Sequence, residues 1–401
     1  MAITLNFPSG SDFSIQDDFW ISALSTNSGQ TDMKYVFDVY KNNQILTRVK
    51  LYPQPSSGRG FFNGTNIYRN AITYDWFTPT PSVASNGPFI TTPPSDAMLA
   101  QFQIRVGEEV AGITTTNIAS GNISLFNYSI PLYKRRQPSI TIGNYQETFL
   151  SNRSKNYVRA QLGQKILIPF KSTELNNGIY MIIKKKVGNT IIQDESSPFS
   201  FSGDYIQLDI GSSAINAMTG FNNFINSSVQ YYDVSIFVDG PSIESEPVRV
   251  WLECNPKLQP INLHFLNAWG MFETACFNLV NKLTSATERK QFAKKEWNYN
   301  GSSVDYYSTR NGSIIYNESK INYGNVVNWE YKLKMDCPDD IDYEWLQELM
   351  DTPQCYAELD GNYYPVTIKD TNYEYSKNVF NGLKTFELTI ELNQTRLGYI
   401  R

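Results

Sequence analysis

The only histidine of the chain, His264, lies in a short stretch, residues 261–277, that also holds Glu273 and Cys276. These side-chain types are those of a nucleophilic site in which the histidine is the base, the glutamate orients it and the cysteine attacks. Such a site needs the thiol and the imidazole within hydrogen-bond reach in a cleft. A turn inside the stretch would bring these residues close together, so the spacing alone does not exclude catalysis.

Other features of the stretch argue against catalysis. If the second half is a strand, Glu273 points to the face opposite Cys276, and no helix begins after Cys276 to lower its pKa. We therefore expect no catalytic residue, no cofactor and no metal ligand. We interpret the stretch as strand, turn and strand, in which Trp269 and Gly270 form the bend and Phe272 follows it. These three are candidates for structural or interface roles.

Composition places the chain in the mostly β class. Of its 401 residues 14% are aromatic, with 26 Tyr and 23 Phe, and 18% are charged, against about 25% charged in an average soluble protein. Tyr, Ile, Val and Thr suit pleated, half-buried surfaces, while Asn and Ser suit the turns between them. Alternating segments meet at turn pairs that tolerate positive φ, and these pairs predict five hairpins. They are Asn42-Asn43, Gly188-Asn189, Asn311-Gly312, Asp360-Gly361 and Asn381-Gly382.

Breaks in the pattern divide the chain into three predicted domains. Residues 1–140 form an N-terminal β domain, and residues 141–256 form a β-sandwich of immunoglobulin or fibronectin type, although no Cys–Trp–Cys signature is present. Residues 257–401 form a β-rich C-terminal domain with one amphipathic helix near 340–351. The expected fold is therefore tandem β-sandwich domains followed by this C-terminal domain.

The predicted helix has a recognisable start, face and end. Ile341, Trp345 and Leu349 recur at helical spacing, and Pro353 ends the pattern. We expect Trp345 and Leu349 to pack the helix on the C-terminal sheet. The densest acids of the chain, Asp339, Asp340, Asp342 and Glu344, suit a helix N-terminus. They lack the partner acid of a hydrolase and the spacing of a calcium loop, so those two alternatives are weaker.

Charge, termini and cysteines limit the partners. The net charge of −5 does not favour a nucleic-acid or anionic-membrane binder. The basic runs 133–137 and 182–189 are typical of exposed strand edges, which they protect against pairing. No secretory signal and no membrane-spanning apolar run are visible. The four cysteines show no disulfide or zinc spacing, so we expect synthesis in a reducing cytoplasm.

A resemblance adds to this interpretation. Four segments resemble virion structural proteins of crAss-like and related tailed phages of Bacteroidetes. They are "LHFLNAWGMFETACF" (residues 263–277), the strand "SEPVRVWLE" before it, the basic "ERKQFAKKEW" after it and the ending from "DYEWLQELM" to "LKTFELTIEL". The likeness covers about residues 240–401, and the sequence departs from the pattern at Met271 and at Ala275–Cys276. The resemblance implies a tail or neck protein.

The function expected from these observations is that of a virion component which forms a homo-oligomeric ring, twelvefold or sixfold, around the DNA channel. Its partners would be copies of itself and neighbouring tail, ring or portal proteins, with genomic DNA passing through without specific binding and no membrane involved. The alternative is a carbohydrate- or receptor-binding virion or baseplate protein. That alternative would use aromatic platforms such as residues 66–77, although such clusters more often form cores or interfaces.

Overall fold

The computed structural model describes a strand-rich chain with three helices in its described residues. The described residues are 3–8, 13–72, 82–83, 89–91, 99–127, 148–172, 178–199, 205–239, 242–253, 259–299, 301–337, 340–370, 384–393 and 396–397. They divide into two compact units. The first comprises Met1–Asn255, His264–Ala275 and Asp339–Pro353, and the second comprises Pro256–Leu263, Cys276–Pro338 and Gln354–Arg401. The mostly β prediction is confirmed.

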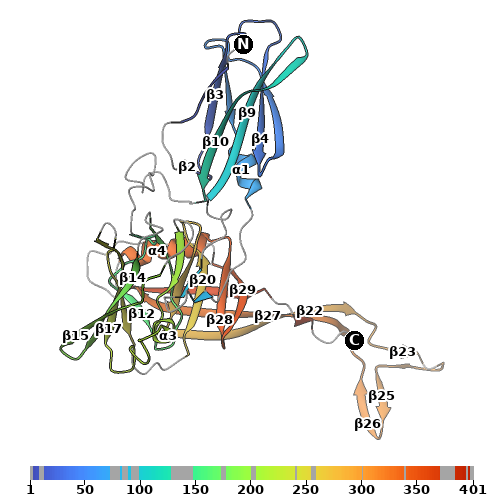
Figure 1. Ribbon diagram of the computed structural model, residues 1–401. Helices are drawn as coiled ribbons and strands as arrows, with labels where there is room; N and C mark the ends of the chain where they lie inside the picture. Colours follow the sequence, from blue (N-terminus) through green and yellow to red (C-terminus); the bar gives the residue numbers. More distant parts are fainter. Residues whose placement is uncertain are drawn as a thin grey trace. The chain divides into compact units, whose positions relative to one another are not determined.

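The first β-sandwich-like body is built from two sheets near the N-terminus (Figure 1). One sheet has the order β1 (Ile3–Asn6), β3 (Trp20–Ser25), β6 (Arg59–Asn63), and the other β2 (Phe13–Ser14), β10 (Ile113–Phe126), β9 (Leu99–Val110), β4 (Lys34–Lys41), β5 (Gln44–Leu51). Phe37 of β4 stacks on Phe62 of β6 with ring centroids 5.0 Å apart, so the core lies between the sheets. The short helix α1 (Thr65–Ala71) adds Tyr68 to that core.

A second pair of sheets follows. The first has the order β11 (Thr148–Phe149), β13 (Leu167–Lys171), β16 (Tyr205–Asp209), β8 (Phe89–Thr91), β7 (Ser82–Val83). The second has the order β12 (Val158–Ala160), β19 (Val248–Leu252), β17 (Tyr231–Val238), β14 (Ile179–Val187), β15 (Thr190–Glu195), with β18 (Ile243–Glu244) beside β17. The buried Tyr232 of β17 donates a hydrogen bond to the Ile210 carbonyl after β16, which ties the two sheets together. Helix α3 (Ser212–Ala217) follows β16.

Strand pairing crosses the limits of the predicted domains. β8 comes before β9 in the sequence, yet it pairs with β16 and not with the N-terminal sheets. The three-domain division of the chain stays a prediction. The basic run at 133–137 lies outside the described residues. The run at 182–189 lies on β14, which has β17 on one side and β15 on the other, so the prediction that it protects an exposed edge is wrong, because β15 covers that edge.

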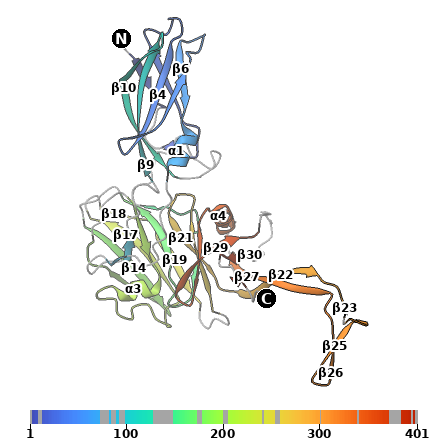
Figure 2. The ribbon, with the colours of Figure 1, turned by 90° about the vertical axis from the view of Figure 1, so that its right-hand side faces the viewer.

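The last large sheet has the order β21 (Phe272–Phe277), β20 (Ile261–Leu266), β28 (Cys355–Leu359), β29 (Asn362–Ile368), β30 (Lys384–Leu392), β27 (Lys320–Cys337), β22 (Val280–Ala293), with β31 (Arg396–Leu397) beside β27. β22 and β27 extend beyond their neighbours as a two-stranded ribbon (Figures 1 and 2). Between them lie two small hairpins, β23 (Asn298–Tyr299) with β24 (Val304–Asp305) and β25 (Tyr307–Arg310) with β26 (Ser313–Tyr316).

The predicted hairpin turns match the structure wherever it describes them. Asn42, Asn43, Gly188, Asn311, Gly312, Asp360 and Gly361 all have positive φ at the tips of the expected hairpins. The fifth turn, Asn381-Gly382, lies outside the described residues.

The predicted helix is α4 (Asp340–Asp351). Trp345 and Leu349 are buried as expected, and Trp345 contacts Phe265 of β20 with ring centroids 5.5 Å apart. Ile341 was expected on the same apolar face but is 51% exposed. The first turn instead turns Asp342 inward, because this carboxylate accepts a hydrogen bond from the Ser154 backbone N–H at 2.9 Å. The backbone N–H of Ser154, in the segment beside the helix, needs an acceptor, and this need turns Asp342 rather than Ile341 inward.

Candidate functional site

The stretch 261–277 forms the hairpin of β20 and β21, and every residue of both strands is buried. His264 and Glu273 have no exposed surface, and Cys276 is 4% exposed. Both faces of the hairpin are therefore covered, which the alternation of the sequence did not predict. A nucleophile must reach its substrate, so this burial disfavours chemistry at these three side chains.

The turn of the hairpin is organised by Asn267. Its side-chain oxygen accepts hydrogen bonds from the backbone N–H groups of Trp269 (3.0 Å) and Met271 (3.2 Å). Its backbone N–H donates to the Met271 carbonyl at 2.8 Å. Gly270 has a φ of +78°, and an added Cβ would lie 2.5 Å from the Asn127 carbonyl oxygen. The bend predicted at Gly270 is thus present, and both its backbone angle and its surroundings require glycine.

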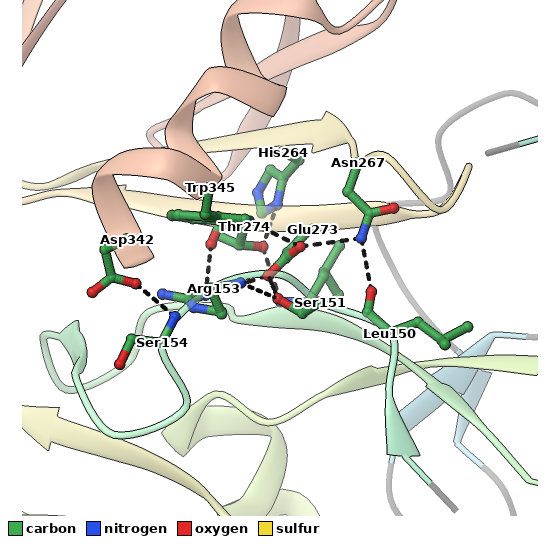
Figure 3. A network of polar contacts seen from close by, with 11 residues as sticks. Leu150, Ser151, Arg153, Ser154, His264, Asn267, Glu273, Thr274, Asp342 and Trp345 are labelled. Carbon is green, nitrogen blue, oxygen red and sulfur yellow. Dashed lines mark hydrogen bonds and ion pairs between the residues drawn. The ribbon is translucent and has the colours of Figure 1, made fainter. Parts of the chain in front are cut away.

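A buried carboxylate lies at the centre of a polar network beside this turn (Figure 3). Glu273 accepts hydrogen bonds from the Ser151 hydroxyl, from the Asn267 side-chain amide at 3.1 Å and from the Trp345 indole at 3.1 Å. The guanidinium of Arg153 lies 3.9 Å from Oε1 of Glu273, the carboxylate oxygen that also accepts from Ser151. Burial raises the pKa of Glu273 above its ordinary value, and the Arg153 charge and these donors oppose that rise.

Arg153 and Thr274 extend the network. The Arg153 guanidinium lies 4.5 Å from the centre of the Trp345 ring and donates to the Thr274 carbonyl at 3.1 Å. The Thr274 hydroxyl accepts from the Leu167 backbone N–H at 2.9 Å and contacts His264 Nδ1 at 2.9 Å. His264 thus contacts a threonine hydroxyl, a contact that the sequence analysis did not consider.

The network joins four segments that are distant in the sequence. Three of them are the loop after β11, the β20–β21 hairpin and helix α4 (Figure 3), and Leu167 at the start of β13 adds the fourth. The Asn267 amide also donates to the Leu150 carbonyl at 3.0 Å, and the Ala268 N–H donates to Glu348 of α4 at 2.8 Å. A shielded carboxylate with several donors and one cation can fix the mutual position of these segments. We call this network around Glu273 the junction, since its contacts hold the segments in place.

The five residues singled out from the sequence lie inside the chain. Trp269, Gly270, Phe272, Trp345 and Leu349 are all buried. Sequence reasoning missed Ser151, Arg153 and Asn267, three of the four partners of Glu273, and it singled out the fourth, Trp345, only as a packing residue. Only Asn267 had a local signal, since an Asn before a Trp-Gly turn commonly caps such a turn with its side chain.

An exposed surface of a different kind lies on the second unit. We call residues 285–325 the arm; they are described apart from residue 300. Every residue from 285 to 299 is exposed, so none of the described residues covers this part of the ribbon. The arm carries many large exposed apolar side chains: Phe292, Trp297, Tyr299, Val304, Tyr306, Tyr307, Ile314, Ile315, Tyr316 and Tyr323.

The arm is a long two-stranded ribbon that extends beyond the rest of its sheet. A 14-residue strand such as β22 spans about 45 Å. An isolated two-stranded ribbon is marginally stable in water, and a concentration of exposed apolar side chains marks a surface that contacts another molecule. Within the described residues, the arm is the surface best suited to a partner. The sequence signal was the lack of a regular apolar period in 285–299.

No group of three or more His, Cys, Asp or Glu side chains in the described ranges is arranged to hold a metal ion. Among those same residues, no helix is both long and apolar enough to cross a membrane. No protein-family model matches the sequence, and no curated protein matches it either.

Proposed function

We propose that this chain is a structural component of a tailed phage virion and forms a homo-oligomeric ring in the tail or neck around the DNA channel. The observation that carries the proposal is the arm, a ribbon whose residues 285–299 are all exposed. A ring requires one face of a subunit to meet a different face of the next, and a projecting element supplies one half of such a contact.

The exposed apolar side chains of the arm favour a protein that assembles with other subunits. An exposed ribbon that carries Phe292, Tyr307, Ile314 and Tyr316 has apolar surface to bury and backbone groups to pair. Aromatic residues are enriched in interface cores. Copies of the chain and neighbouring tail, ring or portal proteins are the proposed partners.

The buried junction supports a role without catalysis. His264, Glu273 and Cys276 are each at most 4% exposed, and the contacts of Glu273 hold distant segments together. A net charge of −5 suits a channel that must let a polyanion pass without trapping it. The proposed location is the virion, after synthesis in the host cytoplasm. The resemblance of residues 240–401 to virion proteins of crAss-like phages implies the same assignment.

One observation favours a second function, the binding of a carbohydrate or receptor by a virion or baseplate protein. The end of the arm bears exposed Tyr299, Tyr306, Tyr307 and Tyr316, and aromatic faces stack on sugar rings much as they pack in interfaces. The platform first considered for this function, residues 66–77, does not add support. Tyr68 is buried in the N-terminal core, and residues 73–77 lie outside the described residues.

The test is the composition and structure of purified particles. We expect mass spectrometry to find the protein in virions in a fixed ratio to the portal protein, and cryo-electron microscopy to place it as a closed ring of six or twelve copies. Absence from particles would refute the proposal. Single copies, or trimers at fibre tips, would instead support the receptor-binding alternative.

A further inference from the structure

Among the described strands, β15 lies at the edge of its sheet. It pairs with β14 on one side, and all six of its residues, Thr190–Glu195, are exposed. Ile191 is 63% and Ile192 42% exposed, and because neighbours alternate, these two side chains lie on opposite faces of the sheet. Natural edges are usually blunted by lysine, proline or a bulge. β15 has none of these, and its charges are the acids Asp194 and Glu195.

The lysines nearest to this edge are engaged on β14. Lys184 forms an ion pair with Glu244 at 3.2 Å. Lys185 donates to the Phe224 carbonyl at 2.8 Å and lies 3.7 Å from the centre of the Phe224 ring. Its charge also acts on Asp194. These lysines lie on β14, so the only charged side chains on the edge strand β15 are Asp194 and Glu195.

Strand β22 is an edge of opposite charge. Among the described strands it pairs with β27 alone, and the sheet order ends at β22. The ladder has an irregularity after Lys290, where the extra residue, Tyr323, belongs to β27, so β22 itself continues as a regular strand. The exposed end of β22 and the residues after it include Arg289, Lys290, Lys294 and Lys295.

The two edges match in one antiparallel register. If Glu195 lies opposite Arg289, then Asp194 lies opposite Lys290, Ile192 opposite Phe292 and Ile191 opposite Ala293. In this register the two acids of β15 face two basic residues, and its two isoleucines face two apolar residues. Paired cross-strand side chains of these kinds are favourable, and the backbone groups of both edges would complete a ladder. Phe292 and Ile192 are 48% and 42% exposed, so both have surface to bury.

We infer that residues 289–294 of one copy, the end of β22 and the residue after it, pair antiparallel with β15 of a second copy, over residues 190–195. The contact joins two different surfaces and is therefore heterologous, as ring closure requires. The inference rests on the proposed ring and names the surfaces by which its subunits meet.

Disulfide trapping between two variants that each carry one added cysteine tests the contact. We would mix differently tagged Ile192→Cys and Phe292→Cys chains, oxidise them and quantify the mixed disulfide. The described native cysteines, Cys276, Cys337 and Cys355, are buried, and unmodified protein measures their background. Ile45→Cys, at a 49% exposed position on the edge strand β5, replaces Ile192→Cys in the matched control. We expect the mixed disulfide to exceed this control by about tenfold or more, because a held contact raises the effective thiol concentration.

Charge reversal provides a second measurement that does not depend on cysteine. Asp194→Lys with Glu195→Lys, or Arg289→Glu with Lys290→Glu, should each weaken self-association by about tenfold. All four changes in one chain should restore it. All four positions are exposed, so the fold should tolerate the changes, and light scattering reports the association.

The outcomes separate this inference from the ring proposal. If the protein is oligomeric but the mixed disulfide stays at the control level and the fourfold variant does not recover, the inference is wrong and the ring proposal stands. A chain that stays monomeric at the highest soluble concentration, or whose Phe292→Cys thiol cross-links to a different protein in particles, also overturns the inference. Absence from virions removes the ring proposal itself.

Discussion

The indole N–H of Trp345 donates a hydrogen bond at 3.1 Å to the carboxylate of Glu273, 72 positions earlier in the sequence. Both residues are almost completely buried. The same indole ring lies against the Arg153 guanidinium. Trp345 therefore packs helix α4 on β20 and also donates a hydrogen bond to the buried Glu273. Its loss should lower stability through both contacts.

Replacing Trp345 with Ala should lower the free energy of unfolding by about 3–5 kcal/mol, since it leaves a large cavity and removes a donor from Glu273. A denaturant titration measures the effect. Ile341→Ala in the same helix is the control, because Ile341 is 51% exposed and should change stability by less than about 0.5 kcal/mol. Equal midpoints for the two variants would contradict the packing of α4.

Glu273 should make stability depend on pH with a definite sign. Burial raises its folded-state pKa above the ordinary value of 4.5, so between these two values the folded chain binds more protons than the unfolded chain. Its contribution to stability is therefore present below pH 4.5 and is lost as pH rises through the folded-state pKa. Glu273→Gln cannot ionise, so the stability difference between wild type and variant should move in favour of the variant between acid and neutral pH.

Urea titrations of wild type and Glu273→Gln across that range measure this difference. The subtraction removes the titration of every other group that the two proteins share. A difference that is independent of pH would contradict the raised pKa.

Gly270 and Gly361 form a matched pair for substitution by alanine. Their φ angles are +78° and +75°, but only at Gly270 would the added Cβ approach another atom, the Asn127 carbonyl oxygen at 2.5 Å. Gly361→Ala should cost about 1–2 kcal/mol from backbone strain alone. Gly270→Ala should cost clearly more, because backbone must move as well. Thermal or denaturant unfolding compares the two, and equal losses would show that the turn has room to relax.

In the proposed virion role, His264→Ala and Cys276→Ser should lower stability but leave particle assembly and infectivity in place, since both side chains are buried in the β20–β21 hairpin. Complementation of a phage lacking the protein measures the effect. A folded His264→Ala protein that assembles normally yet fails to support infection would revive the nucleophilic-site hypothesis.

Shortening the arm should separate folding from assembly. Thr287 and Val327 are cross-strand partners, so joining them through Asn-Gly closes the ribbon with a two-residue turn that suits a hairpin. We expect the unfolding midpoint to change little, because residues 285–299 are exposed, and we expect oligomers to disappear in light scattering. A shortened chain that still forms rings would assign the contact to another surface.

The sequence by itself determined the local features of this protein. The turns at Asn42-Asn43, Gly188-Asn189 and Asp360-Gly361 follow from residues that accept positive φ, and that preference is a property of the residue and its nearest neighbours. The face of α4 that buries Trp345 and Leu349 follows from helical spacing. The glycine bend at Gly270 was predictable for the same local reason.

Only the tertiary structure decided which surfaces are covered. Strand alternation puts His264 on the face opposite Leu263 and Phe265 but does not say which face is buried, and in the structure both faces of β20 are covered. Ser151 and Arg153 reach Glu273 from more than a hundred positions away, and no local pattern encodes such a pairing. The arm is exposed, and β15 rather than β14 is the sheet edge, for the same reason: burial depends on which segments the chain brings alongside, which is a property of the whole fold.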